Sequence, residues 1–199
     1  MAARAIIGLA LATLIYLAPA PPPTQEPIGL GDLGGRLAVM ERKARLLTES
    51  GAQVMDRYRR DVAPIEMALL RSNRVRDPMM ARLAAWAIVR ETETRHLSPE
   101  LVAAVIRVED PWLVTDTVSY AGAVGWMQIK PLHVYDGHPC GTDLTDGDTN
   151  VCYGTTILRE YIARALDRAL REALLAYNGC VSTPGCEVYA DHVLDRVNQ

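Results

Sequence analysis

The sequence predicts a mainly α-helical protein, and two observations carry this prediction. Apolar residues recur at steps of three and four along much of the chain, which is the spacing of one helix face, and few segments alternate between apolar and polar residues. Leucine, alanine, valine and isoleucine are plentiful, whereas phenylalanine is absent. At 199 residues the chain is long enough for one core domain with an N-terminal extension.

The charge balance limits the classes of partner. The net charge is -3, and acidic and basic residues are mixed along the chain. Binding to nucleic acid demands a basic surface, which this distribution does not provide. We therefore expect no nucleic-acid partner.

Residues 1–20 have the layout of a secretory signal peptide. A single arginine precedes a continuous apolar run, and the small residues Ala18 and Ala20 suit cleavage after position 20. The alternative is an uncleaved anchor that associates with a membrane, although the run is shorter than the roughly 20 residues of a membrane span. Both interpretations place the rest of the chain outside the cytoplasm, in the periplasm or cell envelope. Residues 21–35, with four prolines and four glycines, form a predicted linker.

Residues 36–92 are predicted to form a helical extension that begins with a heptad seam. The seam residues are Leu37, Met40, Ala44, Leu47, Gly51, Val54 and Tyr58. Gly51 and then Asp61 are expected to interrupt it. Because the heptads are few, the pattern favours a helix that packs on its neighbour over a dimer zipper, and it leaves the oligomeric state open.

Two prolines divide the rest of this extension. Pro64 and Pro78 mark breaks, which gives helices near 65–75 and 79–95. The residues of the extension point to no particular chemistry.

The next helix carries a candidate acid. Ser98 is the predicted N-cap and Pro99 the first helical position, where the missing amide of proline costs nothing. Glu109 shares the apolar face of this helix with Val102, Val105 and Ile106. A carboxyl group beside buried aliphatic side chains is hard to ionise, so we expect its pKa to rise toward neutrality. Such a group can act as a general acid.

Three helices are predicted after a polar loop at residues 134–150. Asn150 is expected to cap the first of them, which carries Ile157 and Leu158. The second ends near Tyr177, and the following glycine is its predicted stop. The last covers roughly 187–197.

The four cysteines lie in this C-terminal part, at Cys140, Cys152, Cys180 and Cys186. An even number in an exported protein predicts disulfides, and of the three pairings the one with short loops, 140–152 and 180–186, is favoured. A metal site built from the cysteines with His133 and His138 is not expected, because no C-x-x-C pair is present. The loop carboxylates do not have the spacing of a calcium loop. We therefore expect no metal and no cofactor.

Taken in order, the motifs resemble the soluble lytic transglycosylase (SLT) family, whose catalytic domain is a helical, goose-lysozyme-like fold. The resemblance covers about residues 93–197. It consists of L-S-P-E-L-V-A-A-V-I-R-V-E ending at Glu109, S-Y-A-G-A-V-G-W-M-Q-I-K-P, D-x-x-x-N-x-x-x-G from Asp146 to Gly154, A-Y-N-G at 176–179, and Tyr189. It implies a lysozyme-like catalytic domain over 93–199.

The resemblance also implies a reaction and a set of site residues. Glu109 would protonate the glycosidic oxygen of the MurNAc-GlcNAc β-1,4 bond in peptidoglycan strands. The same carboxylate would then deprotonate the C6 hydroxyl, which gives a 1,6-anhydromuramyl product without a second carboxylate. The residues expected to line the glycan groove are Ser119, Met127, Gln128, Tyr177, Asn178 and Tyr189.

Two departures from the family pattern stand close to the acid. Asp110 replaces the usual serine and would raise the pKa of Glu109 further if the two carboxyl groups approach each other. Trp126 replaces the usual leucine, and burial is favoured over stacking on a sugar. The alternatives to a transglycosylase are a lysozyme-type hydrolase of the same fold and a non-catalytic peptidoglycan-binding protein.

Overall fold

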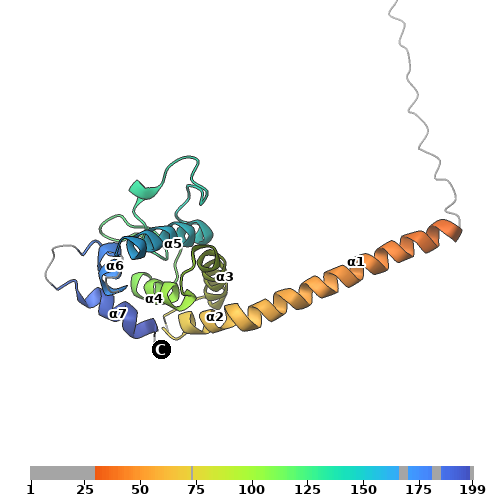
Figure 1. Cartoon of the computed structure of the whole chain (residues 1–199), viewed down its shortest axis with the longest axis horizontal. Coiled ribbons are helices and arrows are strands. Elements are labelled where there is room, and N and C mark those ends of the chain that lie inside the picture. The colour runs from red at the N-terminus through yellow and green to blue at the C-terminus, as the bar shows by residue number, and fades with distance from the viewer. Residues whose placement is uncertain (1–29, 73, 166–169, 181–184, 198–199) are drawn as a thin grey trace, which may run out of the picture. The chain divides into compact units, whose positions relative to one another are not determined.

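The computed structural model describes residues 30–72, 74–165, 170–180 and 185–197 (Figure 1). The predicted signal peptide or anchor at 1–20 lies outside these residues. The chain divides into two units, Met1–Leu47 and Thr48–Gln199. Within the described ranges, none of the helices combines the length and the apolar character that a membrane span requires.

The first helix begins earlier than predicted and is not interrupted where the sequence suggested. α1 (Leu30–Arg57) begins inside the stretch expected to be a linker, so that prediction is wrong for residues 30–35. Gly51 does not interrupt the helix either, because a helical glycine only lowers stability by about 1 kcal/mol. The seam side chains Leu37 and Leu47 are 59% and 75% exposed.

The chain continues from α1 into the next helix without leaving helical geometry. A π-helical turn, η1 (Tyr58–Val62), leads directly into α2 (Ala63–Leu70), where a break near Asp61 and Pro64 was expected. Pro64 has no amide hydrogen and its ring collides with the carbonyl four residues earlier, and a π-turn is a usual way to accommodate such a defect. α2 ends at Leu70, earlier than the predicted residue 75.

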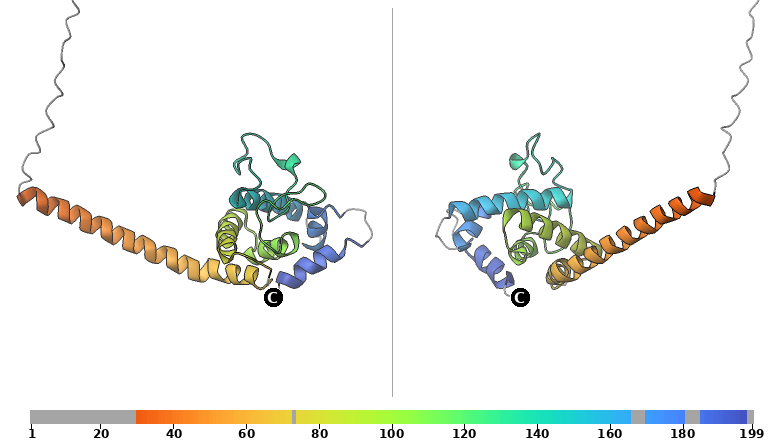
Figure 2. Two further views of the ribbon diagram at one scale, coloured as in Figure 1. Left: turned by 180° about the vertical axis from the view of Figure 1, so that it is seen from behind. Right: turned by 45° about the vertical axis from the view of Figure 1, so that its right-hand side comes forward.

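The core of the unit Thr48–Gln199 is built from α2 and five further helices. Their bounds are α3 (Pro78–Arg95), α4 (Pro99–Glu109), α5 (Gly147–Arg164), α6 (Leu170–Tyr177) and α7 (Val188–Val197). α4 packs on α2, α3 and α7, and all its residues from Leu101 to Arg107 are buried (Figure 2). The boundary predicted at residue 92 falls inside α3, which packs on α2 and α5 in the same core.

Side-chain caps explain where the core helices start. The Ser98 hydroxyl accepts the amide of Leu101 at 3.1 Å, which confirms the predicted cap of α4. The prediction that Asn150 caps α5 is wrong, because Asp146 accepts the amide of Thr149 at 2.8 Å and the helix starts at Gly147. Asn150 therefore lies inside the first turn of α5, where its side chain is free for another role.

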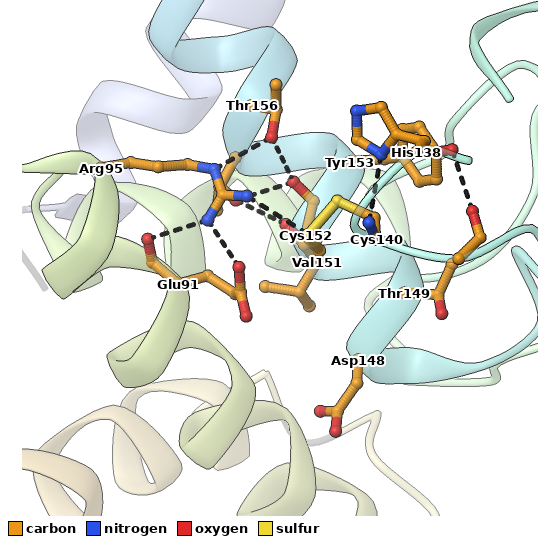
Figure 3. The surroundings of a disulfide bond; sticks show 12 residues. Glu91, Arg95, His138, Cys140, Asp148, Thr149, Val151, Cys152, Tyr153 and Thr156 are labelled. Atoms are coloured by element: carbon orange, nitrogen blue, oxygen red, sulfur yellow. Dashed lines mark hydrogen bonds and ion pairs between the residues drawn. A yellow bond between two sulfur atoms is a disulfide. The ribbon is translucent and has the colours of Figure 1, made fainter. Parts of the chain in front are cut away.

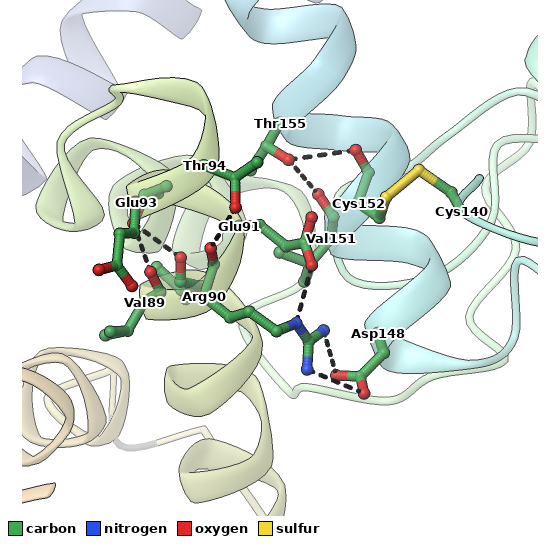
Figure 4. A network of polar contacts seen from close by, with 12 residues as sticks. Val89, Arg90, Glu91, Glu93, Thr94, Cys140, Asp148, Val151, Cys152 and Thr155 are labelled. Atoms are coloured by element: carbon green, nitrogen blue, oxygen red, sulfur yellow. Dashed lines mark hydrogen bonds and ion pairs between the residues drawn. A yellow bond between two sulfur atoms is a disulfide. The ribbon is translucent and has the colours of Figure 1, made fainter. Parts of the chain in front are cut away.

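A polar network clamps α3 to the first turns of α5 (Figure 3, Figure 4). Arg95 binds Glu91 at 2.5 Å and also donates to the Thr156 hydroxyl at 2.9 Å. Arg90 bridges Glu91, at 2.8 Å, and Asp148, at 3.1 Å. These contacts fix the N-terminal end of α5, from which Asn150 projects.

The cysteines pair as the short-loop prediction proposed. Cys140 bonds to Cys152, with 5.6 Å between their Cα atoms, and Cys180 bonds to Cys186. The first disulfide ties the polar loop to α5 beside Arg95 (Figure 3). The second closes the segment between α6 and α7.

Candidate active site

A turn between Thr117 and Ile129 forms one side of the site. It has no regular strand, but isolated antiparallel bridges join Val118 to Val124 and Val124 to Ile129. Gly125 has a φ of +76°, and a Cβ there would lie 2.7 Å from the Asn150 Cγ atom. Only glycine allows both this backbone conformation and this close approach.

Asn150 holds the turn against α5. Its Oδ1 atom accepts the Met127 amide at 2.8 Å, and its Nδ2 group donates to the carbonyls of Val124, at 2.8 Å, and Leu144, at 3.0 Å. The side chain is 1% exposed, so these bonds are not replaced by water. Asn150 thus links the turn, the polar loop and α5 in a single buried contact.

Glu109 is the last residue of α4, and its carboxyl group is largely buried. Burial raises its pKa from 4.5 to about 7, against the opposing effect of a hydrogen bond from Tyr189. The Tyr189 hydroxyl donates to Oε1 of Glu109 at 2.6 Å. The expectation that Glu109 would titrate near neutrality agrees with this environment. The group is therefore able to hold a proton at pH 7 and to release it.

Tyr177 stands beside the acid but binds elsewhere. Its hydroxyl donates to the Met127 carbonyl at 2.8 Å, which joins the end of α6 to the turn. Burial first, and then the negative charge of Glu109, raise the pKa of Tyr177 well above its ordinary value. The tyrosine therefore stays protonated and acts as a fixed hydrogen-bond donor.

These elements enclose a cleft of about 380 Å³. Of the predicted site residues, Glu109, Ser119, Gln128, Tyr177 and Asn178 line it. Two predicted residues do not. Met127 is 0% exposed, with its side chain packed against Gly154, and Tyr189 lies behind Glu109. Met127 thus supports the wall of the cleft and Tyr189 positions the acid, and both do so from outside the cleft.

Several lining residues were missed by the sequence analysis. Ile157 and Tyr161 enter the cleft from α5, where they are one turn apart on the same face. Lys130 and His133 enter from the end of the turn. The helical spacing was available for the first pair, but it did not show that this face lines a cleft rather than a core.

Comparison with known protein families identifies the family to which this part of the chain belongs. Residues 87–184 match the family of the transglycosylase SLT domain. This part of the chain is an SLT domain. Its lysozyme-like helical fold agrees with the predicted fold class, and its type of activity is that of a transglycosylase acting on peptidoglycan. No curated protein matches the chain.

The SLT match ends at residue 184, before α7. Tyr189, the hydrogen-bond partner of the acid, therefore lies outside the matched residues although it lies next to Glu109 in the fold. α7, which begins after the matched residues, packs on α4 and α6 and so brings Tyr189 to the acid.

Asp110 is not a cause of the raised pKa of Glu109. Its carboxylate accepts the amides of Trp112, at 3.2 Å, and Val114, at 2.7 Å, and so caps the turn after α4. Burial raises the pKa of Asp110, while these bonds oppose the change. The raised pKa of Glu109 comes from its own burial rather than from Asp110.

Trp126 is likewise structural in the SLT domain. It is 2% exposed, and its ring covers the α5 N-terminus so closely that a Cβ at Gly147 would overlap it. This side chain does not stack on a sugar from the cleft wall. Among the described residues, no group of three histidine, cysteine or acidic side chains is placed to hold a metal ion.

Proposed function

We propose that the protein is a lytic transglycosylase that cleaves the MurNAc-GlcNAc β-1,4 bond of peptidoglycan strands and leaves a 1,6-anhydromuramyl end. The observation that supports this most directly is a single carboxyl group, Glu109, with a pKa of about 7 at the wall of the cleft. The reaction asks one group to act first as an acid and then as a base, and a pKa near the working pH serves both steps.

In the first step, protonated Glu109 gives its proton to the glycosidic oxygen, and the bond from that oxygen to C1 breaks. In the second step, the C6 hydroxyl oxygen of the same sugar bonds to C1, and the Glu109 carboxylate takes the hydroxyl proton. The acid is thereby restored, no water is consumed, and the two products together have the composition of the substrate.

The composition of the cleft disfavours simple hydrolysis. A glycosidase of the inverting type has a second carboxylate about 6.5–9.5 Å from the acid to activate water, and a retaining enzyme has one at about 5–5.5 Å. Of the described residues that line the cleft, Glu109 alone carries a carboxylate. A mechanism in which one carboxyl group acts first as acid and then as base fits this wall better than a mechanism that needs two carboxylates.

The wall also offers a cation to the substrate. Lys130 lines the cleft with Glu109 and Gln128. Stem peptides on the muramic acid carry carboxylates, and an ammonium group attracts them without fixing a particular geometry. We assign Lys130 to peptide-bearing strands on this basis. The proposed exported location, in the periplasm or envelope, fits a wall substrate and two disulfides.

The test is digestion of purified sacculi followed by mass spectrometry of the soluble products. Wild-type protein should release anhydro-ended muropeptides, and Glu109→Gln should release none. The matched control is Glu100→Gln, which removes an exposed carboxylate from the same helix and should leave the yield unchanged. Products heavier by one water would instead identify a hydrolase. Binding to sacculi without any cleavage across a pH series would contradict an enzymatic role.

A further inference from the structure

The cleft extends along α5 beyond the part that holds the acid. Met127 marks the acid's part of the cleft, because its carbonyl accepts the hydroxyl of Tyr177, which stands beside Glu109. The Met127 side chain packs against Gly154 of α5. Tyr161 also lines the cleft, and it follows Gly154 by seven residues, or about 11 Å along the helix axis. This span is longer than a single sugar ring, so the acid and Tyr161 mark different parts of the cleft.

Tyr161 is not part of the hydrophobic core. Among the described residues of α5, Ile157 and Ile162 pack against the buried core cluster, whereas Tyr161 does not. Its side chain is nevertheless half-buried in the wall of the cleft. A role in holding the fold together therefore does not account for this aromatic ring.

One face of the Tyr161 ring is covered by a residue of its own helix. The Arg164 guanidinium lies over the ring, 5.8 Å from its centroid, and the same arginine binds Glu160 at 3.0 Å. No other ring or cation of the described residues stacks on Tyr161. The arginine thus shields one face of the ring, and the other face remains open to the cleft.

The hydroxyl group of Tyr161 is also available to a ligand. Of the two tyrosines in the described lining, Tyr177 donates its hydroxyl to Met127, whereas the Tyr161 hydroxyl makes no hydrogen bond to a described residue. A sugar ring has hydroxyl groups around its rim and C–H groups on its faces. The electron-rich face of an aromatic ring attracts these weakly positive hydrogens, so a tyrosine with one open face suits a sugar.

We propose that Tyr161 stacks on a sugar of the glycan strand beyond the sugar that meets Glu109, and that this contact makes the protein select longer strands over short ones. The inference rests on the proposed function, since it takes the glycan strand as the ligand of the cleft. The stacked sugar does not react, so the contact is equally strong before and during bond cleavage. Such a contact lowers KM and leaves kcat unchanged.

The first test measures kcat and KM on peptide-free glycan strands of increasing, defined length. Strands without peptide are used because they remove any contribution of Lys130. Tyr161→Ala should raise KM about tenfold on long strands, because it removes a stacked ring and the apolar surface that the ring covers. It should leave kcat unchanged, and it should not affect the shortest strands that the wild type cleaves.

Three further variants show which property of the side chain matters. Tyr161→Phe keeps the ring and should stay within about twofold of the wild type on every length, because it loses at most one hydrogen bond. Tyr161→Leu keeps apolar bulk without a flat ring and should behave like Tyr161→Ala. The matched control is Tyr135→Ala, which removes an exposed tyrosine ring that does not line the cleft and should match the wild type.

The second test measures binding of the same strands without turnover, with Glu109→Gln as the parent protein. Adding Tyr161→Ala to this parent should weaken binding of long strands about tenfold, whereas adding Tyr135→Ala should not. Because this assay needs no cleavage, it separates failure of the inference from failure of the proposed reaction. Thermal midpoints report whether each variant is folded, and Tyr161→Leu carries the comparison if Tyr161→Ala is not.

Three results would overturn the inference. The first is that the Tyr161→Ala and Tyr135→Ala variants bind and cleave long strands alike. The second is a loss of equal size on strands of every length, which would mean that Tyr161 acts at the acid's part of the cleft. The third is a loss that appears only on peptide-bearing strands, which would identify the stem peptide rather than a sugar as the partner of Tyr161.

Discussion

Replacing Glu109 by glutamine should make the folded protein more stable at alkaline pH, even though it destroys the proposed acid. Burial holds the pKa of Glu109 at about 7, against 4.5 for an ordinary glutamate. At 1.36 kcal/mol for each pKa unit, this difference is worth about 3 kcal/mol. Glutamine keeps the oxygen that accepts the Tyr189 hydroxyl but carries no charge to bury.

The sign of the effect follows from proton binding. Below pH 4.5 the carboxyl group is protonated in both states, so the variant and the wild type should differ little because of this group. Between pH 4.5 and 7 the folded state holds the proton while the unfolded state has lost it, and wild-type stability therefore falls as the pH rises. Above pH 8 the glutamine variant should have gained the full difference of about 3 kcal/mol relative to its position at pH 4.

Urea unfolding at constant ionic strength from pH 4 to 9 measures this directly. The informative quantity is the free energy of unfolding of Glu109→Gln minus that of the wild type, plotted against pH. Glu100→Gln serves again as control for the loss of one carboxylate from the same helix. A Glu109→Gln difference that follows that of this control at every pH would show that folding does not perturb the acid, and the proposed mechanism would lose its main support.

Three further substitutions test the site from other sides. Tyr189→Phe removes a hydrogen bond that lowers the pKa of Glu109, so the upper limb of the kcat/KM profile should move above pH 7; a shift to lower pH would contradict the geometry. Asn150→Ala removes three buried hydrogen bonds and should cost about 3 kcal/mol in urea unfolding, whereas a loss below about 1 kcal/mol would mean that the turn stands without it. Lys130→Gln should raise KM about threefold for peptide-bearing strands. It should leave peptide-free strands unaffected, and equal changes for both would refute its assignment.

The parts of the fold that the sequence predicted well depend on local chemistry. The Ser98 hydroxyl caps α4 by accepting the amide of Leu101. The serine and the proline that follows it are enough to predict this cap. The face of Glu109 follows from helical spacing within the same segment. The start of α5 was predicted wrongly because local chemistry leaves two choices there. Asp146 and Asn150 are both good N-caps, and only the fold decides which one is used.

What local patterns could not show is which distant groups meet. The three partners of Asn150 lie 6 to 26 residues away in the chain, and its burial depends on all of them. The helical spacing of Ile157 and Tyr161 places them on one face, but it does not show that an open cleft lies in front of that face. The place of Tyr189 came only from a family resemblance, because nothing in α7 itself points to Glu109.

The bond between Tyr189 and Glu109 has a consequence for the order in which the protein becomes active. The two residues are 80 positions apart, and Tyr189 lies on α7, which the chain produces after every residue that lines the cleft. A growing chain that has reached Gly179 therefore contains every residue of the cleft wall. It still lacks the Tyr189 hydroxyl, whose hydrogen bond lowers the pKa of Glu109. Synthesis alone thus delays the finished acid until the last helix has been made and has docked on α4.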